Sequence, residues 1–449
     1  MSSIDLNRGV TAPVSHELDC LDLRVTGVIP SDLNGVLVRN GPNPVRGHFN
    51  GHDVSDWWPE DAMLHGITLS KGRAVQYRNR WVRTQRWARC ASPDAVATLV
   101  DTNPNVNVVA HAGEILALAE GGAPLAITTA LDTLGPSVHH PGLADGMTAH
   151  PKIDPHTGEL ISFRANWQRP FLRYQVTDAG GKVSTDVEFD IATPSMMHDM
   201  AITATRTVLF DLNVGFDFSM LSRGFRMPLR WRDEHRARLG VIDRHGRSMR
   251  WFAIAPCFIQ HVVNAYDVDK ETVVLDVVRY PDYFRLRQDG SGYEANPLGV
   301  LWRYTVDLER GTVIETQLDD MHVELPRINE RYTGQPYRYV YAVEQPTTIE
   351  MRGIVRCDLV TGAKQRFAVP ERDQNSEPVF VARENAIKEA DGWLLVCVNR
   401  HATDTTDLVI LNAAHVDEPP AATVHLPCRV PAGFHGAWID AVVPAYATA

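Results

Sequence analysis

Short runs of apolar, β-branched and aromatic residues recur along this chain and predict a protein built from β-strands. Long amphipathic helical patterns are scarce, and the two clearest helix candidates are residues 94–102 and 217–225. The best strand candidates are residues 73–87, 206–214, 271–280, 338–345 and 392–400. We therefore expect an all-β fold with few, short helices.

A loose internal repeat strengthens this expectation. A strand pattern runs into Asp, a short turn closes with Gly, and a second strand pattern leaves the turn. The repeat occurs at residues 152–163, 173–189, 302–318 and 353–369. Asp opens such turns by bonding backbone amides, and Gly accepts the positive φ that closes a hairpin. Repeated hairpins are typical of a β-propeller, although a large sandwich uses the same turn chemistry.

Length and composition add limits on the class of protein. The 449 residues contain 44% hydrophobic and 22% charged residues, as in a folded globular protein. No linker or change of composition divides the chain, so we expect a single domain over residues 1–449. The net charge is -11, with both signs mixed along the chain, which argues against a nucleic-acid partner. The oligomeric state cannot be read from this pattern.

The cysteines and the N-terminus bear on the compartment. None of the 6 cysteines forms a CxxC pair, and their spread suits reduced thiols better than a disulfide framework. The N-terminal residues 1–13 lack a basic start followed by an apolar stretch, so no signal peptide is expected. No apolar run reaches the roughly 18–20 residues that span a bilayer. We expect a cytoplasmic protein.

Four of the 18 histidines lie in distinctive phrases that are far apart. They are His150 in TAHPKIDPHTGEL, His198 in MMHDMAIT, His261 in FIQHVVNAYD and His435 in GFHGAWI. Four neutral imidazoles can hold one Fe(II) ion and leave two coordination positions open for dioxygen chemistry. The spacing alone does not select these four, because only the tertiary fold could bring them together.

Other histidine arrangements compete with this set. His322 and Glu324, with a distant histidine, could form a facial triad of the kind found in cupin-like oxygenases. The segment 48–53 contains two histidines but also a glycine and no helical pattern, so a coordinating pair is not expected there. The adjacent pair His139 and His140 precedes Pro141 and is expected in a polar loop.

Taken in order, these phrases resemble the carotenoid cleavage oxygenase family, which includes the lignostilbene dioxygenases. The resemblance covers most of the chain. It also rests on NGVLVRNGPNP (34–44), LALAEGG (116–122), VELPRINERYTGQPYRYVYA (323–342) and SEPVFVAR (376–383). The family resemblance implies a seven-bladed β-propeller, with a cap of loops and short helices over an axial iron site. It also implies an Fe(2+) cofactor held by the four histidines.

The resemblance assigns further residues and an activity. Three glutamates would orient the metal-binding imidazoles, and the matching positions are Glu120, Glu324 and Glu377. The implied enzyme is a non-haem iron dioxygenase that cleaves a carbon–carbon double bond with O₂ and gives two carbonyl products. No catalytic residue beyond the metal centre is implied, and the chain has no nucleophile elbow and no phosphate-binding loop.

The substrate class is where this chain departs from some relatives. Relatives that cleave hydroxylated stilbenes usually carry Lys immediately before the first glutamate, where this chain has Ala119, and a Tyr near the position of Trp81. We therefore expect a small apolar alkene of the apocarotenoid type, with a stilbenoid or phenylpropanoid alkene as the alternative. Near residues 57–65, Pro59 and Glu60 stand where the family usually has small residues, so the shape of this loop is expected to differ from that in relatives.

Residues 216–231 combine Phe, Met, Leu and Trp with several Arg. This composition suits a helix at a membrane surface, and it equally suits a cap helix packed on the protein with its Arg side chains extended along it. Peripheral membrane contact therefore remains open. Two further outcomes also remain open, namely an isomerase of the same family and an iron-free binding module.

Overall fold

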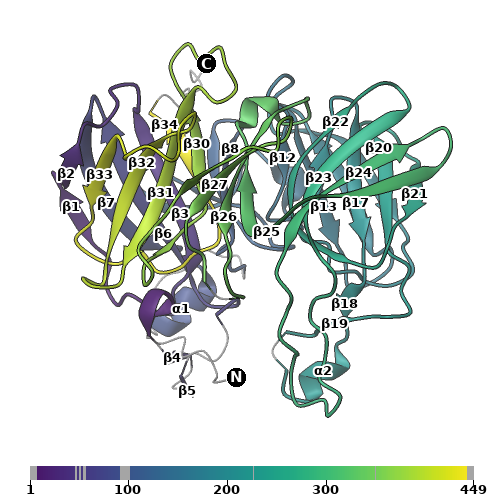
Figure 1. Ribbon diagram of the computed structural model, residues 1–449. Helices are drawn as coiled ribbons and strands as arrows, with labels where there is room; N and C mark the ends of the chain where they lie inside the picture. The colour runs from purple at the N-terminus through teal and green to yellow at the C-terminus, as the bar shows by residue number, and fades with distance from the viewer. Residues whose placement is uncertain are drawn as a thin grey trace. The chain divides into compact units, whose positions relative to one another are not determined.

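The computed structural model describes residues 8–45, 48–49, 52–53, 57–91, 102–225, 227–348 and 350–441. The chain divides into two compact units. Unit 1 contains residues 1–149, 352–356 and 365–449, and unit 2 contains residues 150–351 and 357–364. Within the described residues both units consist almost entirely of antiparallel sheets, as Figure 1 shows, and the all-β expectation is confirmed.

The described part of unit 1 contains three main sheets and a small two-stranded ribbon. The strand orders are β1-β7-β6-β3-β34, β11-β10-β9-β8 and β2-β33-β32-β31-β29, with β30 also paired to β31 and β4 paired to β5. The strands are β1 (Asp19–Leu21), β2 (Arg24–Gly27), β3 (Gly35–Pro42), β4 (His48–Phe49), β5 (His52–Asp53), β6 (Ala62–Ser70), β7 (Arg73–Trp81), β8 (Asn107–His111), β9 (Glu114–Leu118), β10 (Leu125–Ile127), β11 (Thr133–Pro136), β29 (Gln374–Asn375), β30 (Val379–Ala382), β31 (Gly392–Arg400), β32 (Thr405–Asn412), β33 (Ala422–His425) and β34 (Gly436–Asp440).

Unit 2 follows the same plan, with the orders β12-β13-β14-β15, β16-β17-β20-β21, β18-β19 and β22-β23-β24-β25-β26. The strands are β12 (Lys152–Ile153), β13 (Leu160–Ala165), β14 (Leu172–Thr177), β15 (Val183–Phe189), β16 (Ala201–Ile202), β17 (Arg206–Asp211), β18 (Val214–Phe216), β19 (Leu229–Trp231), β20 (Arg238–Asp243), β21 (Met249–Ala253), β22 (Phe258–Asp267), β23 (Thr272–Tyr280), β24 (Val300–Asp307), β25 (Thr312–Arg327) and β26 (Tyr339–Glu344). The boundary between the units passes through the hairpin β27 (Ile354–Asp358) and β28 (Lys364–Phe367).

The hairpins expected from the Asp–turn–Gly repeat are present. In the turn between β14 and β15, the Asp178 carboxylate accepts the N–H groups of Gly180 at 3.0 Å and Lys182 at 2.9 Å. Gly181 adopts a φ of 92° in the same turn, a conformation that residues with a Cβ rarely tolerate. Because this chemistry is local, the sequence pattern was sufficient to predict it.

Helices are few and short among the described residues, as expected. They are α1 (Gln85–Ala91), α2 (Ser219–Ser222) and the 3₁₀ turns η1 (Gly9–Thr11), η2 (Pro141–Leu143) and η3 (Glu330–Tyr332). The helix expected near residue 220 is confirmed as α2, whereas the one expected at 94–102 lies almost entirely outside the described residues. The strand expected over 73–87 ends at Trp81, and α1 begins at Gln85. No helix in the described ranges is long and apolar enough to cross a bilayer.

Each unit has its own apolar core. In unit 2 the core includes Phe163, Tyr174, Phe210 and Tyr304, all at most 2% exposed. A buried side chain of this size contributes roughly 1.5–3 kcal/mol relative to an exposed one.

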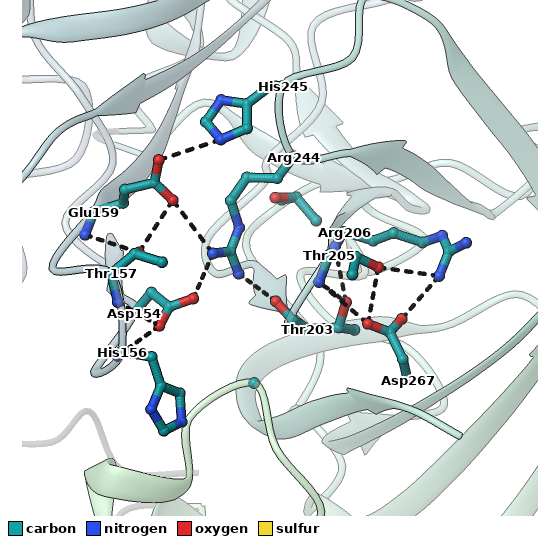
Figure 2. A network of polar contacts seen from close by, with 12 residues as sticks. Asp154, His156, Thr157, Glu159, Thr203, Thr205, Arg206, Arg244, His245 and Asp267 are labelled. Atoms are coloured by element: carbon teal, nitrogen blue, oxygen red, sulfur yellow. Dashed lines mark hydrogen bonds and ion pairs between the residues drawn. The ribbon is translucent and has the colours of Figure 1, made fainter. Parts of the chain in front are cut away.

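Polar side chains join neighbouring sheets of unit 2 (Figure 2). The Arg244 guanidinium, only 5% exposed, donates to Asp154, to Glu159 at 3.3 Å and to the Thr203 carbonyl. These partners belong to the turns that follow β12 and β16, and Arg244 itself follows β20 of the β16 sheet, so one cation links segments from two sheets. Removing one acceptor would leave the buried Arg244 charge partly without a partner, which destabilises a folded protein.

Candidate metal centre

Three of the predicted ligands lie together in unit 2. His150 precedes β12, His198 precedes β16, and His261 lies within β22; all three are buried. The ring centroids of His150 and His198 are 4.4 Å apart, and those of His150 and His261 are 5.3 Å apart. The centroids of His198 and His261 are separated by 5.1 Å. Three sheets therefore each deliver one imidazole to the same place.

The fourth predicted ligand, His435, lies in unit 1 immediately before β34 and is also buried. Its backbone N–H donates to the Val106 carbonyl at 3.1 Å. The possible ligand atoms of the four histidines all lie within 4.8 Å of one another, and the described residues contain no other such group of three or more histidines, cysteines or carboxylates. The four predicted histidines are thus a possible metal site.

The buried carboxylate of Glu324, 2% exposed, holds the ring of His261. Its Oε2 atom lies 2.5 Å from His261 Nδ1 and accepts the Leu325 N–H, while the Tyr280 hydroxyl donates to Oε1 at 2.7 Å. Burial raises the pKa of Glu324, but the neighbouring His261 and these hydrogen bonds outweigh burial, so the net pKa is lowered. Glu324 is therefore held as a carboxylate that accepts hydrogen bonds.

Glu377 has the matching place beside His435, within unit 1. Its Oε2 atom lies 3.0 Å from His435 Nδ1, and its Oε1 atom accepts the Gly436 N–H at 2.6 Å. The buried guanidinium of Arg39 donates to Oε1 at 2.7 Å and to the Phe434 carbonyl at 3.0 Å. Glu377 thus accepts hydrogen bonds from a side-chain cation, a backbone amide and an imidazole.

These contacts match the needs of an imidazole–metal centre. A carboxylate that accepts from Nδ1–H fixes the tautomer in which Nε2 carries the lone pair for a metal. An imidazole nitrogen binds a divalent metal such as zinc at about 2.0–2.1 Å, so ligands on opposite sides of an ion lie roughly 4 Å apart. The donor set consists of neutral nitrogens, which suits iron and other first-row transition metals. The residues present therefore fit such an ion.

The third predicted glutamate, Glu120, lies in the turn after β9 (Glu114–Leu118), and its side chain is exposed, unlike those of Glu324 and Glu377. Ala119, its neighbour, is buried. The role of Glu120 stays a prediction.

Among the described residues, the competing arrangement of His322 and Glu324 does not assemble. His322 is exposed on β25 although Glu324 is buried, and it does not belong to the four-histidine group. The side chains of residues 48–53 lie outside the description. His140 was expected in a polar loop but is buried, with its Nε2 atom 2.8 Å from His111 Nδ1.

An aromatic cluster adjoins the His435 segment in unit 1. The ring centroid of Phe434 lies 4.5 Å from that of Trp57 and 5.0 Å from that of Trp58. The loop after these tryptophans is fixed in place, because Arg86 on α1 bonds Glu60 at 3.3 Å and Asp61 at 3.0 Å. Apolar and aromatic surface of this kind suits an alkene ligand.

Sequence reasoning identified Glu324 and Glu377 but missed their partners, Arg39 and Tyr280. Arg39 interrupts the apolar phrase GVLVRNGP, and Tyr280 ends the strand phrase ETVVLDVVRY. A charged residue within a buried strand is a usable signal, because such a group needs a partner. The sequence does not say which distant carboxylate that partner is.

Comparison with known proteins places the chain among oxygenases. The model of the family described as retinal pigment epithelial membrane protein matches residues 11–440. A carotenoid cleavage oxygenase from Mycobacterium tuberculosis is 36% identical, with 96% of each chain covered. The carotenoid 9,10(9',10')-cleavage dioxygenase 1 of Arabidopsis thaliana is 30% identical, with 96% of this chain and 89% of the relative covered.

Two solved structures share the fold. A cobalt-substituted form of the Synechocystis apocarotenoid oxygenase has a TM-score of 0.86 and 25% identity, covering 95% of this chain and 97% of that one. The lignostilbene dioxygenase of Pseudomonas brassicacearum has a TM-score of 0.87 and 26% identity, covering 97% and 98%. The expectation of a β-propeller fold is confirmed by this likeness.

Proposed function

Because the chain belongs to the retinal pigment epithelial membrane protein family, that of the carotenoid cleavage oxygenases, we propose that it is an Fe(II)-dependent dioxygenase. It cleaves a carbon–carbon double bond of an apocarotenoid-like substrate with O₂ and releases two carbonyl products. The observation that carries this proposal is the group of four buried histidines. We also propose that residues 1–449 form one domain, because a single family match spans 11–440.

In this proposal the four ligands are His150, His198, His261 and His435. When bound, Fe(II) would supply the oxygen chemistry that no amino-acid side chain provides. The protein holds the imidazoles in one tautomer and excludes water around the alkene. Glu324 and Glu377 orient His261 and His435 through the contacts described above, and we propose Glu120 as a third orienting carboxylate.

The preference for an apolar substrate is supported by two positions in unit 1. Ala119 is buried and provides neither charge nor hydrogen bond where Lys would meet a phenolic oxygen. Trp81 is also buried, and its indole N–H already donates to the Asn43 carbonyl at 2.8 Å. Neither side chain is available to anchor a phenol, which favours an apolar polyene.

A stilbenoid or phenylpropanoid alkene is the second candidate substrate. The fold likeness to the lignostilbene dioxygenase favours it, at a TM-score of 0.87. The chemistry at the metal would be the same, so only the substrate distinguishes the two candidates.

The direct test is incubation of Fe(II)-loaded protein in ¹⁸O₂ with an apocarotenal or with a 4-hydroxystilbene, followed by mass spectrometry of the products. Labelled aldehydes from the apocarotenal alone support the proposal. Labelled aldehydes from the stilbene alone would replace the substrate but keep the reaction. Rearranged apocarotenal without label would indicate an isomerase, and a protein that retains no iron would indicate a binding module.

We expect Glu377→Gln to weaken the affinity for Fe(II) by about 10–100-fold, the usual effect of changing a group that orients a metal ligand. An amide can no longer accept from His435, Gly436 and Arg39 at once as the carboxylate does. Competition with a chromophoric chelator measures the affinity. Glu384→Gln, at an exposed glutamate, is the matched control. Equal affinities in the two variants would return Glu377 to an ordinary structural role.

An exposed apolar patch in unit 2 favours membrane contact. It consists of Trp167 (56% exposed), Phe218 (44%) and Leu221 (51%), and the ring centroids of Trp167 and Phe218 are 5.2 Å apart. Leu221 belongs to α2, which Figure 1 shows next to β18 and β19. Within α2, Met220 is fully buried. The helix is therefore packed on the protein and also presents apolar side chains outward. We propose that this patch contacts the membranes in which apolar substrates dissolve.

The doubly substituted variant F218D/L221D is expected to lose most binding to anionic phospholipid vesicles, because two charges would face the bilayer. Co-sedimentation with vesicles measures the bound fraction. V360D introduces a charge at another exposed apolar side chain and serves as the control. If F218D/L221D sediments with vesicles as the wild-type protein does, the patch does not contact the membrane.

We further propose that the protein acts in the cytoplasm. None of its six cysteines, all of which lie in described segments, forms a disulfide. Reduced thiols suit a reducing compartment.

A further inference from the structure

The carboxylate of Asp199, adjacent to His198, is the focus of this inference. Asp199 is 2% exposed, and the sequence patterns assign it no role. Its Oδ1 atom accepts the Met200 N–H at 2.7 Å and lies 2.7 Å from Lys152 Nζ. Its Oδ2 atom accepts the Val262 N–H at 2.7 Å. Both oxygens are therefore engaged, each in short contacts.

The partners of Asp199 are the neighbours of the other two histidines in unit 2. Lys152 follows His150 by two residues, and Val262 directly follows His261. One carboxylate thus bonds to all three chain segments that carry these histidines.

The segments need such a tie because their own hydrogen-bond ladders are short or irregular. β12 and β16 contain two residues each and pair with one neighbouring strand over those residues only. β22 is longer, but its register with β23 shifts on both sides of Val262. Such bulges re-aim side chains and are common next to active sites.

A second set of contacts, shown in Figure 2, joins the same segments at residues that lie farther along the chain from the histidines. Arg244 donates to Asp154 and to the Thr203 carbonyl, in the turns that follow β12 and β16. Asp267, at the end of β22, accepts from Thr205 Oγ1 at 2.9 Å and from Arg206 Nη1 at 3.0 Å. The contacts of Arg244 and Asp267 hold the sheets together. Asp199 instead fixes the distances between the segments beside the histidines.

We propose that Asp199 and Lys152 are positioning residues that set the separation of His150, His198 and His261, and thereby the affinity and coordination geometry of the metal. The inference rests on the proposed function, since it assigns those histidines as ligands. Asp199 does not contact the metal in this account. It acts through the backbone of β22 and through the side chain of Lys152.

The test uses Co(II) as the probe, because its visible absorption reports coordination geometry independently of turnover. In the full chain, Asp199→Asn is expected to weaken Co(II) affinity by about 10–100-fold and to change the Co(II) spectrum, the usual range for a residue that orients ligands. Lys152→Met is expected to weaken affinity less, because Asp199 keeps its two backbone donors. Lys152→Arg retains the cation and should restore near wild-type affinity and spectrum.

Arg244→Met provides the matched control. It removes buried hydrogen bonds to the turns that follow β12 and β16, and none of these bonds involves the histidines or the residues that Asp199 contacts. It should lower the midpoint of thermal unfolding and leave Co(II) affinity and spectrum unchanged. Asp199→Asn with lowered thermal stability but wild-type Co(II) binding would overturn the proposal and make Asp199 an ordinary structural residue. If Asp199→Asn does not fold, wild-type Co(II) binding by Lys152→Met overturns it equally. Wild-type protein without Co(II) or Fe(II) binding would overturn the proposed function itself.

Discussion

His261→Ala should purify without iron and show no measurable cleavage. His261 is held from two sides, because Glu324 accepts from its Nδ1 atom at 2.5 Å and Asp199 accepts from the backbone N–H of the next residue. Alanine removes one of four proposed ligands and leaves the Glu324 carboxylate buried without its imidazole. The loss of a ligand and the loss of the hydrogen bond to Glu324 both lower the affinity for the metal ion.

Metal analysis of the purified variant and product analysis by mass spectrometry measure the two parts of this expectation. His156→Ala is the matched control, because it removes an exposed imidazole that does not belong to the four-histidine group. Circular dichroism of both variants separates loss of the site from loss of the fold. Full iron content and turnover in His261→Ala would show that the ligand assignment is wrong.

The fold was predictable where its determinants are local. The hairpins at 152–163, 173–189 and 302–318 follow from an Asp that accepts turn amides and a Gly that adopts positive φ. The strand over 73–87 was overextended, because apolar and basic residues continue past Trp81 into α1 without a break in pattern. The propeller was not fixed by hairpins alone, since a sandwich uses the same turns.

The possible metal site was predictable only in part. The four histidines were identified by the order of their phrases, whereas their spacing in the chain would have suited many folds. The supporting contacts join residues that are far apart in sequence, such as Arg39 with Glu377 and Asp199 with Val262. No local pattern encodes such pairs. A buried charge in an apolar phrase shows that a partner exists, and only the tertiary structure identifies it.

Arg39→Met is expected to lower the free energy of unfolding of the chain by about 3–5 kcal/mol, the usual penalty for removing one member of a buried ion pair. Arg39 and Glu377 have side-chain exposures of only 4% and 1%, and their charged atoms are 2.7 Å apart. Methionine fills a similar volume but leaves the Glu377 carboxylate without its cation. The Phe434 carbonyl also loses a donor, next to His435. Chemical denaturation of metal-free protein measures the change.

The double variant Arg39→Met/Glu377→Gln separates charge from packing. Because no charge then remains buried without a partner, the double variant should recover part of the stability that Arg39→Met loses. Its metal affinity should stay as low as that of Glu377→Gln, because the side chain at position 377 no longer accepts from His435 as a carboxylate. Recovery of stability without recovery of affinity would mean that Arg39 serves the fold by neutralising Glu377, while Glu377 serves the metal by orienting His435. Arg39→Met with wild-type stability would contradict the buried pair.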